Sequence, residues 1–154
     1  MTEVSNILSR SEEETLDIGM RIGKSCTGGE CISLVGPLGS GKSVLTRGIA
    51  RGLGITGTVR SPSFNLMREY AGRLTLKHWD LYRLEGGYRE LGLLESVDGE
   101  SVVVIEWAER WNELESFSTG IIKLDYGEEE THRSIRIGRN VPGFNGEKNN
   151  VACD

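Results

Sequence analysis

The sequence predicts a three-layer α/β domain whose central sheet is mixed and largely parallel, with added antiparallel strands. The first observation behind this prediction is a strand, a loop and a helix in direct succession. A short apolar run lies at 30–35, a glycine-rich stretch at 36–41, and apolar residues recur at helical spacing from Lys42 onward. The second observation is the run 101–107, whose consecutive Val and Ile residues are typical of a central parallel strand with both faces covered. Together they predict the fold of P-loop nucleotide triphosphatases.

The N-terminal part of the chain predicts a short strand at 4–8 and then a helix. Ser11, followed three residues later by Glu14, forms a capping-box pattern that opens this helix, which extends to about Lys24. The pattern places one more strand and one more helix before the glycine-rich unit.

The second half of the chain predicts mostly strands. The runs 64–70 and 74–79 flank a short turn and predict a hairpin. Residues 90–95 suit a short helix, and the runs 120–126 and 131–138 predict a pair of neighbouring strands. These last strands supply the antiparallel part of the sheet.

The elements place a single P-loop domain at 1–138. The stretch 139–154 is dominated by Asn, Gly and charged residues, so we expect a flexible C-terminal tail. The formal net charge of -5 argues against broad, nonspecific binding of nucleic acid, because such binding needs clustered Lys and Arg.

The three cysteines, Cys26, Cys31 and Cys153, lack the spacing of a metal site. The first two lie in or beside predicted core elements and are expected to be small buried hydrophobic residues. No charged-then-apolar export signal and no apolar run of membrane length is found, so we expect a cytoplasmic protein without a membrane partner.

The glycine-rich loop carries the clearest chemistry, because residues 36–43 read G-x-x-x-x-G-K-S. Its glycines let the backbone turn so that successive N–H groups face phosphate oxygens. Lys42 brings a positive charge to the β- and γ-phosphates, and Ser43 offers a hydroxyl to Mg²⁺. The alternative is a glycine-rich connection with a solvated lysine. We expect a site for a nucleoside triphosphate and Mg²⁺.

Hydrolysis needs a second carboxylate for Mg²⁺ and a group that orients water. Glu106 follows the buried run 102–105 and is the candidate carboxylate; the alternative is a glutamate at an ordinary strand exit. Asp80 could orient water or bind Mg²⁺ through a water, or it could be a turn or capping aspartate. With Lys42, these two residues are the candidate catalytic groups.

Two neighbours of the carboxylates have open roles. Trp107 could close over the site or simply pack. His78 lies two residues before Asp80, so on an extended strand both side chains face the same way, although a lone histidine is more often structural than catalytic.

Four segments together resemble the TsaE family, also called YjeE, which are small bacterial ATPases of the tRNA threonylcarbamoyladenosine pathway. The resemblance extends from about Ser11 to Ile137. The segments that carry it are Gly36-Pro37-Leu38-Gly39-Ser40-Gly41-Lys42-Ser43, Ser61-Pro62-Ser63-Phe64, His78-Trp79-Asp80-Leu81-Tyr82-Arg83-Leu84 and Val104-Ile105-Glu106-Trp107.

The resemblance implies roles for individual residues. It implies that Ser43 and Glu106 hold Mg²⁺ and that Asp80 supports hydrolysis of ATP. It implies that the triphosphate is bound by the loop residues Pro37, Leu38, Gly39, Ser40, Gly41, Lys42, Ser43 and Val44. It implies that a switch or lid near the γ-phosphate includes Ser61, Pro62, Ser63 and Phe64, and we place His78 and Trp107 in the same region. It implies that the adenosine lies near Ser11, Glu12 and Arg133.

Two positions depart from the family pattern. The family usually has an acid where this chain has Pro37, which has no N–H to donate, and Thr is commoner than Ser at position 43. The resemblance also implies partners: a TsaB–TsaD heterodimer, in which TsaD transfers the threonylcarbamoyl group. We expect tRNA to be held only through that complex.

Three other functions would use the same loop. A small-molecule kinase would need a lid of converging arginines, and Arg133, Arg136 and Arg139 are the available set. On a strand Arg136 faces opposite to the other two, which argues against such a lid. A GTPase is disfavoured because no N-K-x-D segment is found. A non-catalytic module that binds nucleotide only for structure is the third alternative.

Overall fold

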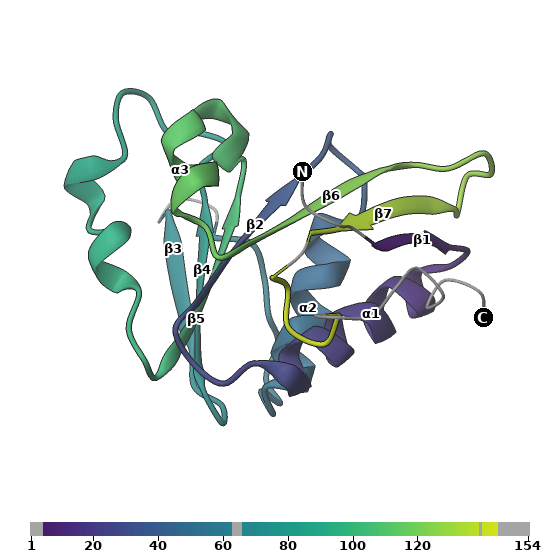
Figure 1. Ribbon diagram of the computed structural model, residues 1–154, viewed down its shortest axis with the longest axis horizontal. Coiled ribbons are helices and arrows are strands. Elements are labelled where there is room, and N and C mark those ends of the chain that lie inside the picture. Colours follow the sequence, from purple (N-terminus) through teal and green to yellow (C-terminus); the bar gives the residue numbers. More distant parts are fainter. Residues whose placement is uncertain (1–4, 63–65, 139, 145–154) are drawn as a thin grey trace.

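The computed structural model describes residues 5–62, 66–138 and 140–144, which form one sheet with helices on both faces (Figure 1). The strands are β1 (Ser5–Ser9), β2 (Glu30–Val35), β3 (Met67–Tyr70), β4 (Thr75–Asp80), β5 (Ser101–Glu106), β6 (Gly120–Tyr126) and β7 (Arg133–Ile137). The α-helices are α1 (Glu12–Ser25), α2 (Lys42–Gly52) and α3 (Asn112–Phe117), and the 3₁₀ helices are η1 (Arg89–Leu91), η2 (Leu94–Ser96) and η3 (Ala108–Arg110).

The sheet has seven strands in the order β1-β7-β6-β2-β5-β4-β3 within the described residues. Its centre is parallel, because β2 pairs in parallel with β6 and β5, and β5 pairs in parallel with β4. Both ends are antiparallel, through β1, β7 and β6 on one side and the β3–β4 hairpin on the other. The predicted fold class is confirmed, with the parallel part limited to four central strands.

The core lies in two layers, one on each face of the sheet. Strand β5 contributes to both, since Val102 and Val104 pack into the cluster that contains α1 and α2 residues, whereas Val103 and Ile105 pack into the cluster under the short helices. Both faces are covered, so the strand needs no polar face, and this explains the unbroken apolar run. The prediction of a central parallel strand at this position is confirmed.

Helices α1 and α2 cross with their backbones in close contact. A Cβ added at Gly48 would lie 2.3 Å from the carbonyl oxygen of Leu16 and 2.9 Å from the Cα of Gly19. Neither neighbour is a flexible side-chain end that could move aside. The glycines therefore permit a packing distance that no other residue allows at these positions.

Replacing Gly48 by Ala is expected to lower the free energy of unfolding by at least about 1 kcal/mol. The clash with backbone atoms costs about 2–3 kcal/mol, at the upper end of the usual range because neither neighbour can move aside, and this exceeds the gain of up to about 1 kcal/mol in helix propensity. Thermal unfolding followed by circular dichroism measures this as a lower Tm. Gly99→Ala is the control, since no atom lies within 4 Å of an added Cβ there. An equal or higher Tm for the Gly48 variant would contradict the close crossing.

The N-terminal elements and the hairpin are found close to their predicted positions. Ser11 caps α1, because its Oγ accepts a hydrogen bond from the backbone N–H of Glu14. Cys26 and Cys31 are buried as predicted, and burial raises the pKa of each thiol to about 12. Both thiols therefore stay protonated at neutral pH and are poor nucleophiles. Cys153 lies outside the described residues.

Two predictions of local structure are wrong. The expected helix at 90–95 is two separate 3₁₀ turns, η1 and η2, because Gly92 between them adopts a left-handed backbone with φ 84°. The expected flexible tail is contradicted at its start, since Val141 and Phe144 are buried in the core cluster on the α1 side. The ring of Phe144 lies under the guanidinium of Arg21, 4.2 Å from the centroid. Residues 145–154 lie outside the described residues.

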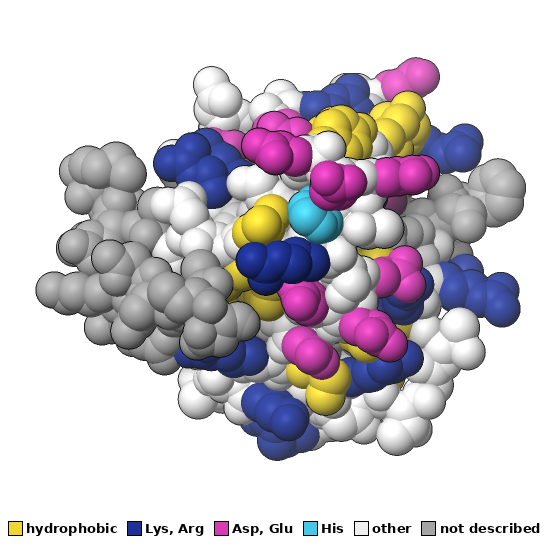
Figure 2. All heavy atoms as spheres, turned by 90° about the vertical axis from the view of Figure 1, so that its right-hand side faces the viewer, with side chains coloured by type: hydrophobic (Ala, Val, Ile, Leu, Met, Phe, Trp, Pro, Cys, Tyr) yellow, Lys and Arg dark blue, Asp and Glu magenta, His cyan; other side chains and the backbone are white. Residues whose placement is uncertain are grey.

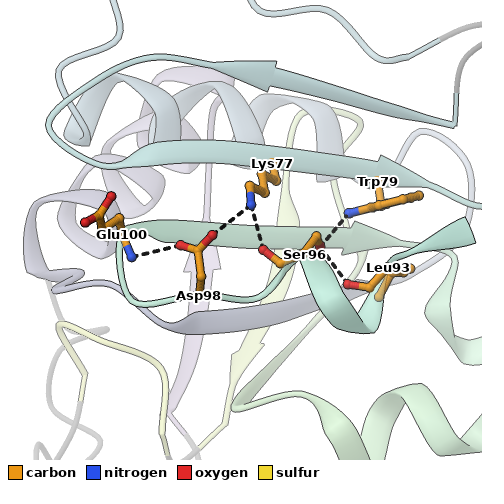
Figure 3. Close-up of polar contacts among 6 residues, drawn as sticks. All are labelled: Lys77, Trp79, Leu93, Ser96, Asp98 and Glu100. Atoms are coloured by element: carbon orange, nitrogen blue, oxygen red, sulfur yellow. Dashed lines mark hydrogen bonds and ion pairs between the residues drawn. The ribbon is translucent and has the colours of Figure 1, made fainter.

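Strand β4 is connected to the segment 93–100 by a network of hydrogen bonds (Figure 3). Lys77 Nζ donates to the carbonyl oxygen of Ser96 at 2.8 Å and to Asp98 Oδ2 at 3.0 Å. The indole N–H of Trp79 donates to Ser96 Oγ at 3.3 Å. The backbone N–H of Glu100 donates a hydrogen bond to Asp98, and this bond is the main cause of the lowered pKa of Asp98. Hydrogen bonds from side chains lower this pKa further. These bonds fix the strand that ends at Asp80.

The surface is of mixed charge. On the face shown in Figure 2, acidic and basic side chains are interspersed and apolar ones occur in small separate groups. None of the helices within the described residues combines the length and the apolar character that a membrane span requires.

Candidate functional site

The glycine-rich loop joins the end of β2 to the start of α2. Gly39 (φ 77°) and Gly41 (φ 105°) adopt the left-handed backbone that favours glycine. Within the described parts of the chain, the backbone N–H groups of residues 41–44 donate to no acceptor. These N–H groups stand at the start of α2, where the helix dipole adds positive partial charge. The loop therefore presents a set of donors suited to an anion.

Lys42 is almost fully buried at the centre of this loop, with 5% of its surface exposed. Its Nζ donates to the carbonyl oxygen of Gly36 and lies 3.7 Å from the ring centroid of Trp107. Burial lowers the pKa of the ammonium group, and the nearby charges of Glu106, Glu109 and Asp80, in that order, oppose the shift. The three carboxylates thus favour the charged form of Lys42.

Asp80 and Glu106 lie side by side at the carboxyl ends of two parallel strands. The register of β4 and β5 pairs these two residues, and the register of β2 and β5 pairs Leu34 with Glu106. The strand order β2-β5-β4 therefore places Glu106 next to the glycine-rich loop and Asp80 one strand further away. The predicted position of Glu106 beside the loop is found, while its binding of Mg²⁺ stays a prediction.

Glu106 is held from behind by His78. The Nε2 of His78 lies 2.8 Å from Glu106 Oε2, and both side chains are buried. This hydrogen bond restricts the rotamer of Glu106 and leaves its other oxygen for a different partner. His78 Nδ1 has no partner among the described residues. His78 is buried within β4, and its assignment to a switch or lid stays a prediction.

Asp80 is half-buried, and its surroundings shift the pKa of its carboxyl group in opposite directions. Burial raises the pKa of Asp80, while a hydrogen bond from the backbone N–H of Tyr82 to Oδ1, at 3.0 Å, lowers it. The charge of Glu106 raises the pKa further. The carboxylate therefore holds a proton more readily than a solvated aspartate does.

Trp107 follows Glu106 in a left-handed conformation with φ 69°, which is strained for an aromatic residue. This backbone turns the indole back over Lys42 and against the ring of Tyr82, whose centroid lies 5.0 Å away at an interplanar angle of 47°. Trp107 thus packs at the rim of the site. Closure over a ligand stays a prediction.

Two site residues were not predicted from the sequence, Tyr82 and Glu109. Tyr82 follows Asp80 by two residues, in the same dense polar run, and that proximity was the available signal. Glu109 lies in η3 after Glu106, and its Oε2 accepts a long hydrogen bond of 3.4 Å from the N–H of Gly36. Its Oε1 is buried without a partner in the described residues. It adds a third carboxylate near Lys42.

A cavity of about 390 Å³ brings most of the predicted residues together. It lies between the loop, the carboxyl ends of β4 and β5, and the N-terminus of α1. The lining residues are Glu12, Leu38, Gly39, Gly41, Lys42, Ser43, Val44, Ser61, Asp80, Tyr82, Glu106, Trp107 and Arg133.

A second cavity of about 290 Å³ adjoins the first and shares Glu12, Gly41, Val44 and Arg133 with it. Ser11 also lines this cavity. The residues predicted to lie near an adenosine are therefore together at one end of the loop. The guanidinium of Arg133 is held by hydrogen bonds of 2.7 Å to the carbonyl oxygens of Glu130 and His132.

Besides His78, three predicted residues of the described chain lie away from the cavity walls. Pro37 is exposed on the outer side of the loop, and its carbonyl oxygen accepts from the N–H of Ser40 at 3.2 Å. Ser40 is buried beneath the loop, and its Oγ has no partner among the residues described. Pro62 is buried, while Ser63 and Phe64 lie outside the described residues.

The donor set fits a polyphosphate with a small divalent cation. Lys42 and the free N–H groups supply positive charge, and the exposed Ser43 with Glu106 and Asp80 supplies oxygen ligands. The described residues contain no group of three or more His, Cys, Asp or Glu arranged for a metal ion. A cation here therefore needs ligands from the polyphosphate, which is how Mg²⁺ is usually bound in such sites.

Comparison with known proteins places this site in a family. The family described as "Threonylcarbamoyl adenosine biosynthesis protein TsaE" matches residues 9–135. A protein of that name from Nostoc is 37% identical over 140 residues, covering 86% of this chain and 85% of the relative. The Treponema pallidum protein of the same name is 42% identical over 105 residues, covering 67% and 78%. The crystal structure of Bacillus subtilis YdiB superposes with a TM-score of 0.76 at 30% identity, covering 91% of this chain and 88% of that one. The chain therefore belongs to the TsaE family of threonylcarbamoyl adenosine biosynthesis proteins.

Proposed function

We propose that this protein binds ATP with Mg²⁺ and hydrolyses it, in support of tRNA threonylcarbamoyladenosine modification. The observation that carries the proposal is the pairing of Asp80 and Glu106 in register at the strand ends, facing the loop that holds Lys42. A phosphate-binding loop alone serves binding, whereas a loop opposed by two adjacent carboxylates also serves hydrolysis.

In this proposal the loop N–H groups and Lys42 bind and orient the β- and γ-phosphates. The hydroxyl of Ser43 and the carboxylate of Glu106 hold Mg²⁺, with His78 keeping the Glu106 side chain in place. A bound Mg²⁺ supplies charge stabilisation to the transferring phosphoryl group. Asp80 orients the attacking water.

The adenosine lies in the second cavity, against α1 and β7. Ser11, Glu12 and Arg133 line its wall. Trp107 and Ser61 border the phosphate end. We propose that these two residues shield the γ-phosphate and the attacking water from bulk solvent, as lids do in other phosphoryl-transfer enzymes.

The partner we propose is a TsaB–TsaD-like complex, which holds the tRNA and performs the transfer. This chain would use ATP hydrolysis to support repeated turnover of the complex. The family name supports the pathway. The net charge of -5 agrees with a protein that does not bind tRNA tightly by itself.

The test is Mg²⁺-dependent ATP hydrolysis by the purified protein, alone and with a bacterial TsaB–TsaD pair. We expect slow hydrolysis alone and faster hydrolysis with the pair. Absence of hydrolysis under both conditions would overturn the ATPase. If the protein hydrolyses ATP but the pair neither binds it nor changes the rate, the proposed partnership is overturned. The proposed ATPase activity is then kept.

The alternative function, a small-molecule kinase, gains no support from the arginines. Arg133 lines the cavity, whereas Arg136 is exposed on the opposite face of β7, and Arg139 lies outside the described residues. A screen of phosphate acceptors tests this alternative directly, since transfer to any acceptor faster than to water would establish a kinase.

A further inference from the structure

A further cavity of the described structure lies outside the proposed nucleotide site. It has a volume of about 750 Å³ and is formed by the second half of α2 and the loop that follows. The lining residues are Arg47, Ala50, Arg51, Gly54, Ile55, Thr56, Gly57, Thr58, Val59 and Arg60. We call this cavity the arginine groove. None of the described residues that line it is acidic, although the chain as a whole carries a net charge of -5.

The three arginines stand on two walls of the groove. Arg47 and Arg51 are one helical turn apart on α2, so their side chains are neighbours, and Arg60 comes from the loop. Like charges at this spacing destabilise a helix, and no acid in the lining compensates for them. On the face shown in Figure 2, by contrast, charges of both signs are interspersed.

Within the described residues, the arginines of the groove are largely without partners. Arg47 lies 4.0 Å from Glu12, at the limit of an ion pair. Arg51 and Arg60 form no ion pair and no side-chain hydrogen bond within the described residues. Their guanidinium groups are therefore available to an external anion.

The loop wall adds further donors. In the described structure, the backbone N–H groups of residues 56–59 donate to no acceptor, and Thr56 and Thr58 add hydroxyl groups. The carbonyl groups at the end of α2 would repel an anion, but Ala50 and Arg51 already accept hydrogen bonds from Leu53, Gly54 and Ile55. The groove thus offers many donors.

We propose that the arginine groove makes a weak, salt-sensitive contact with the phosphodiester backbone of RNA, which revises the expectation that tRNA is held only through the partner complex. Guanidinium forks, backbone N–H groups and hydroxyls are the groups that contact nucleic-acid phosphates. Among the described residues, the lining has no aromatic side chain on which a base could stack, so the contact made by these residues is independent of sequence. An acidic protein segment is the less favoured occupant, since protein interfaces usually centre on aromatic or large apolar anchors. The proposal goes beyond the ATPase and needs only the pathway of the family.

The groove is joined to the proposed nucleotide site through consecutive residues. Arg60 lines the groove and Ser61 lines the nucleotide cavity, while Glu12 lines that cavity and approaches Arg47. An RNA strand held by Arg60 therefore restrains the adjacent Ser61, which lines the nucleotide cavity. This arrangement links RNA contact to the position of Ser61.

The test is fluorescence anisotropy with an unmodified tRNA transcript at low salt, comparing the protein with Arg51→Gln/Arg60→Gln. We expect the double variant to bind at least about tenfold more weakly. We expect its slope of log affinity against log salt to be shallower by about 1.4, because two phosphate contacts of a single strand are lost. The matched control is Arg68→Gln/Arg136→Gln, which removes two exposed arginines from β3 and β7 and should change the affinity less than about twofold.

Three results would overturn the proposal: no tRNA binding by the unchanged protein at low salt, an equal loss in both double variants, or preferential binding of a polyglutamate peptide by the groove. The last result would assign the groove to an acidic protein segment. ATP hydrolysis measured on the same samples separates this proposal from the proposed function. Hydrolysis that persists while tRNA binding is absent would remove the groove proposal alone.

Discussion

Replacing Lys42 by Met is expected to weaken ATP binding by at least about 30-fold, and replacing it by Ala is expected to do the same. Removing one partner of a buried charge pair costs about 2 kcal/mol or more, which corresponds to that factor. Lys42 is the side-chain cation at the centre of the loop, and the neighbouring Glu106, Glu109 and Asp80 would otherwise repel a polyphosphate. Isothermal titration calorimetry with ATP and Mg²⁺ measures the change.

The Met variant is the more informative of the two. Its unbranched side chain keeps apolar contact with Trp107, so it removes the charge with little loss of packing. Lys123→Met is the matched control, because Lys123 is exposed on β6 and outside both cavities. A folded Met variant that binds ATP as tightly as the unchanged protein would show that the main counter-charge lies elsewhere, with Arg133 the next candidate.

Regular elements were predictable where one physical pattern dominated. The alternation of Val102 to Ile105 between two core layers needs an apolar residue at every position, and the sequence displays this directly. The helix at 90–95 was mispredicted because its composition suits a helix, whereas the left-handed Gly92 divides it. The start of the tail was mispredicted because only two residues, Val141 and Phe144, enter the core. Isolated anchors of this kind have no periodicity to detect.

The site was predictable where strand order alone places a residue. Glu106 and Asp80 end two runs that read as strands, and parallel strands bring their carboxyl ends to one edge of the sheet. The contacts between side chains were not predictable. The burial of His78 behind Glu106, and the turn of Trp107 over Lys42 through a positive φ, depend on registers and backbone angles that a single sequence does not display. The arginine groove depends likewise on how the loop returns along α2.

Replacing Glu106 by Gln is expected to slow Mg²⁺-dependent ATP hydrolysis by about 100-fold or more while changing the affinity for ATP only a few-fold. Gln has the same shape and can still accept the hydrogen bond from His78, so the fold should be kept. What is lost is the negative charge that helps hold Mg²⁺, and losses of electrostatic groups in active sites typically cost 10²–10³ in rate. Single-turnover hydrolysis over a range of Mg²⁺ concentrations measures this effect, and half-maximal rate should need more Mg²⁺ in the variant.

Asp80→Asn is the comparison variant for this experiment. The two carboxylates are paired in register, and only one of them is expected to contact the metal directly. The Asn side chain keeps the acceptor for the N–H of Tyr82. If Asp80 only orients water, its variant should lower the maximal rate without changing the Mg²⁺ requirement. If instead Glu106→Gln leaves both rate and Mg²⁺ requirement unchanged while Asp80→Asn raises the requirement, the metal is bound at Asp80. Glu106 would then serve to fix His78 at the centre of the sheet.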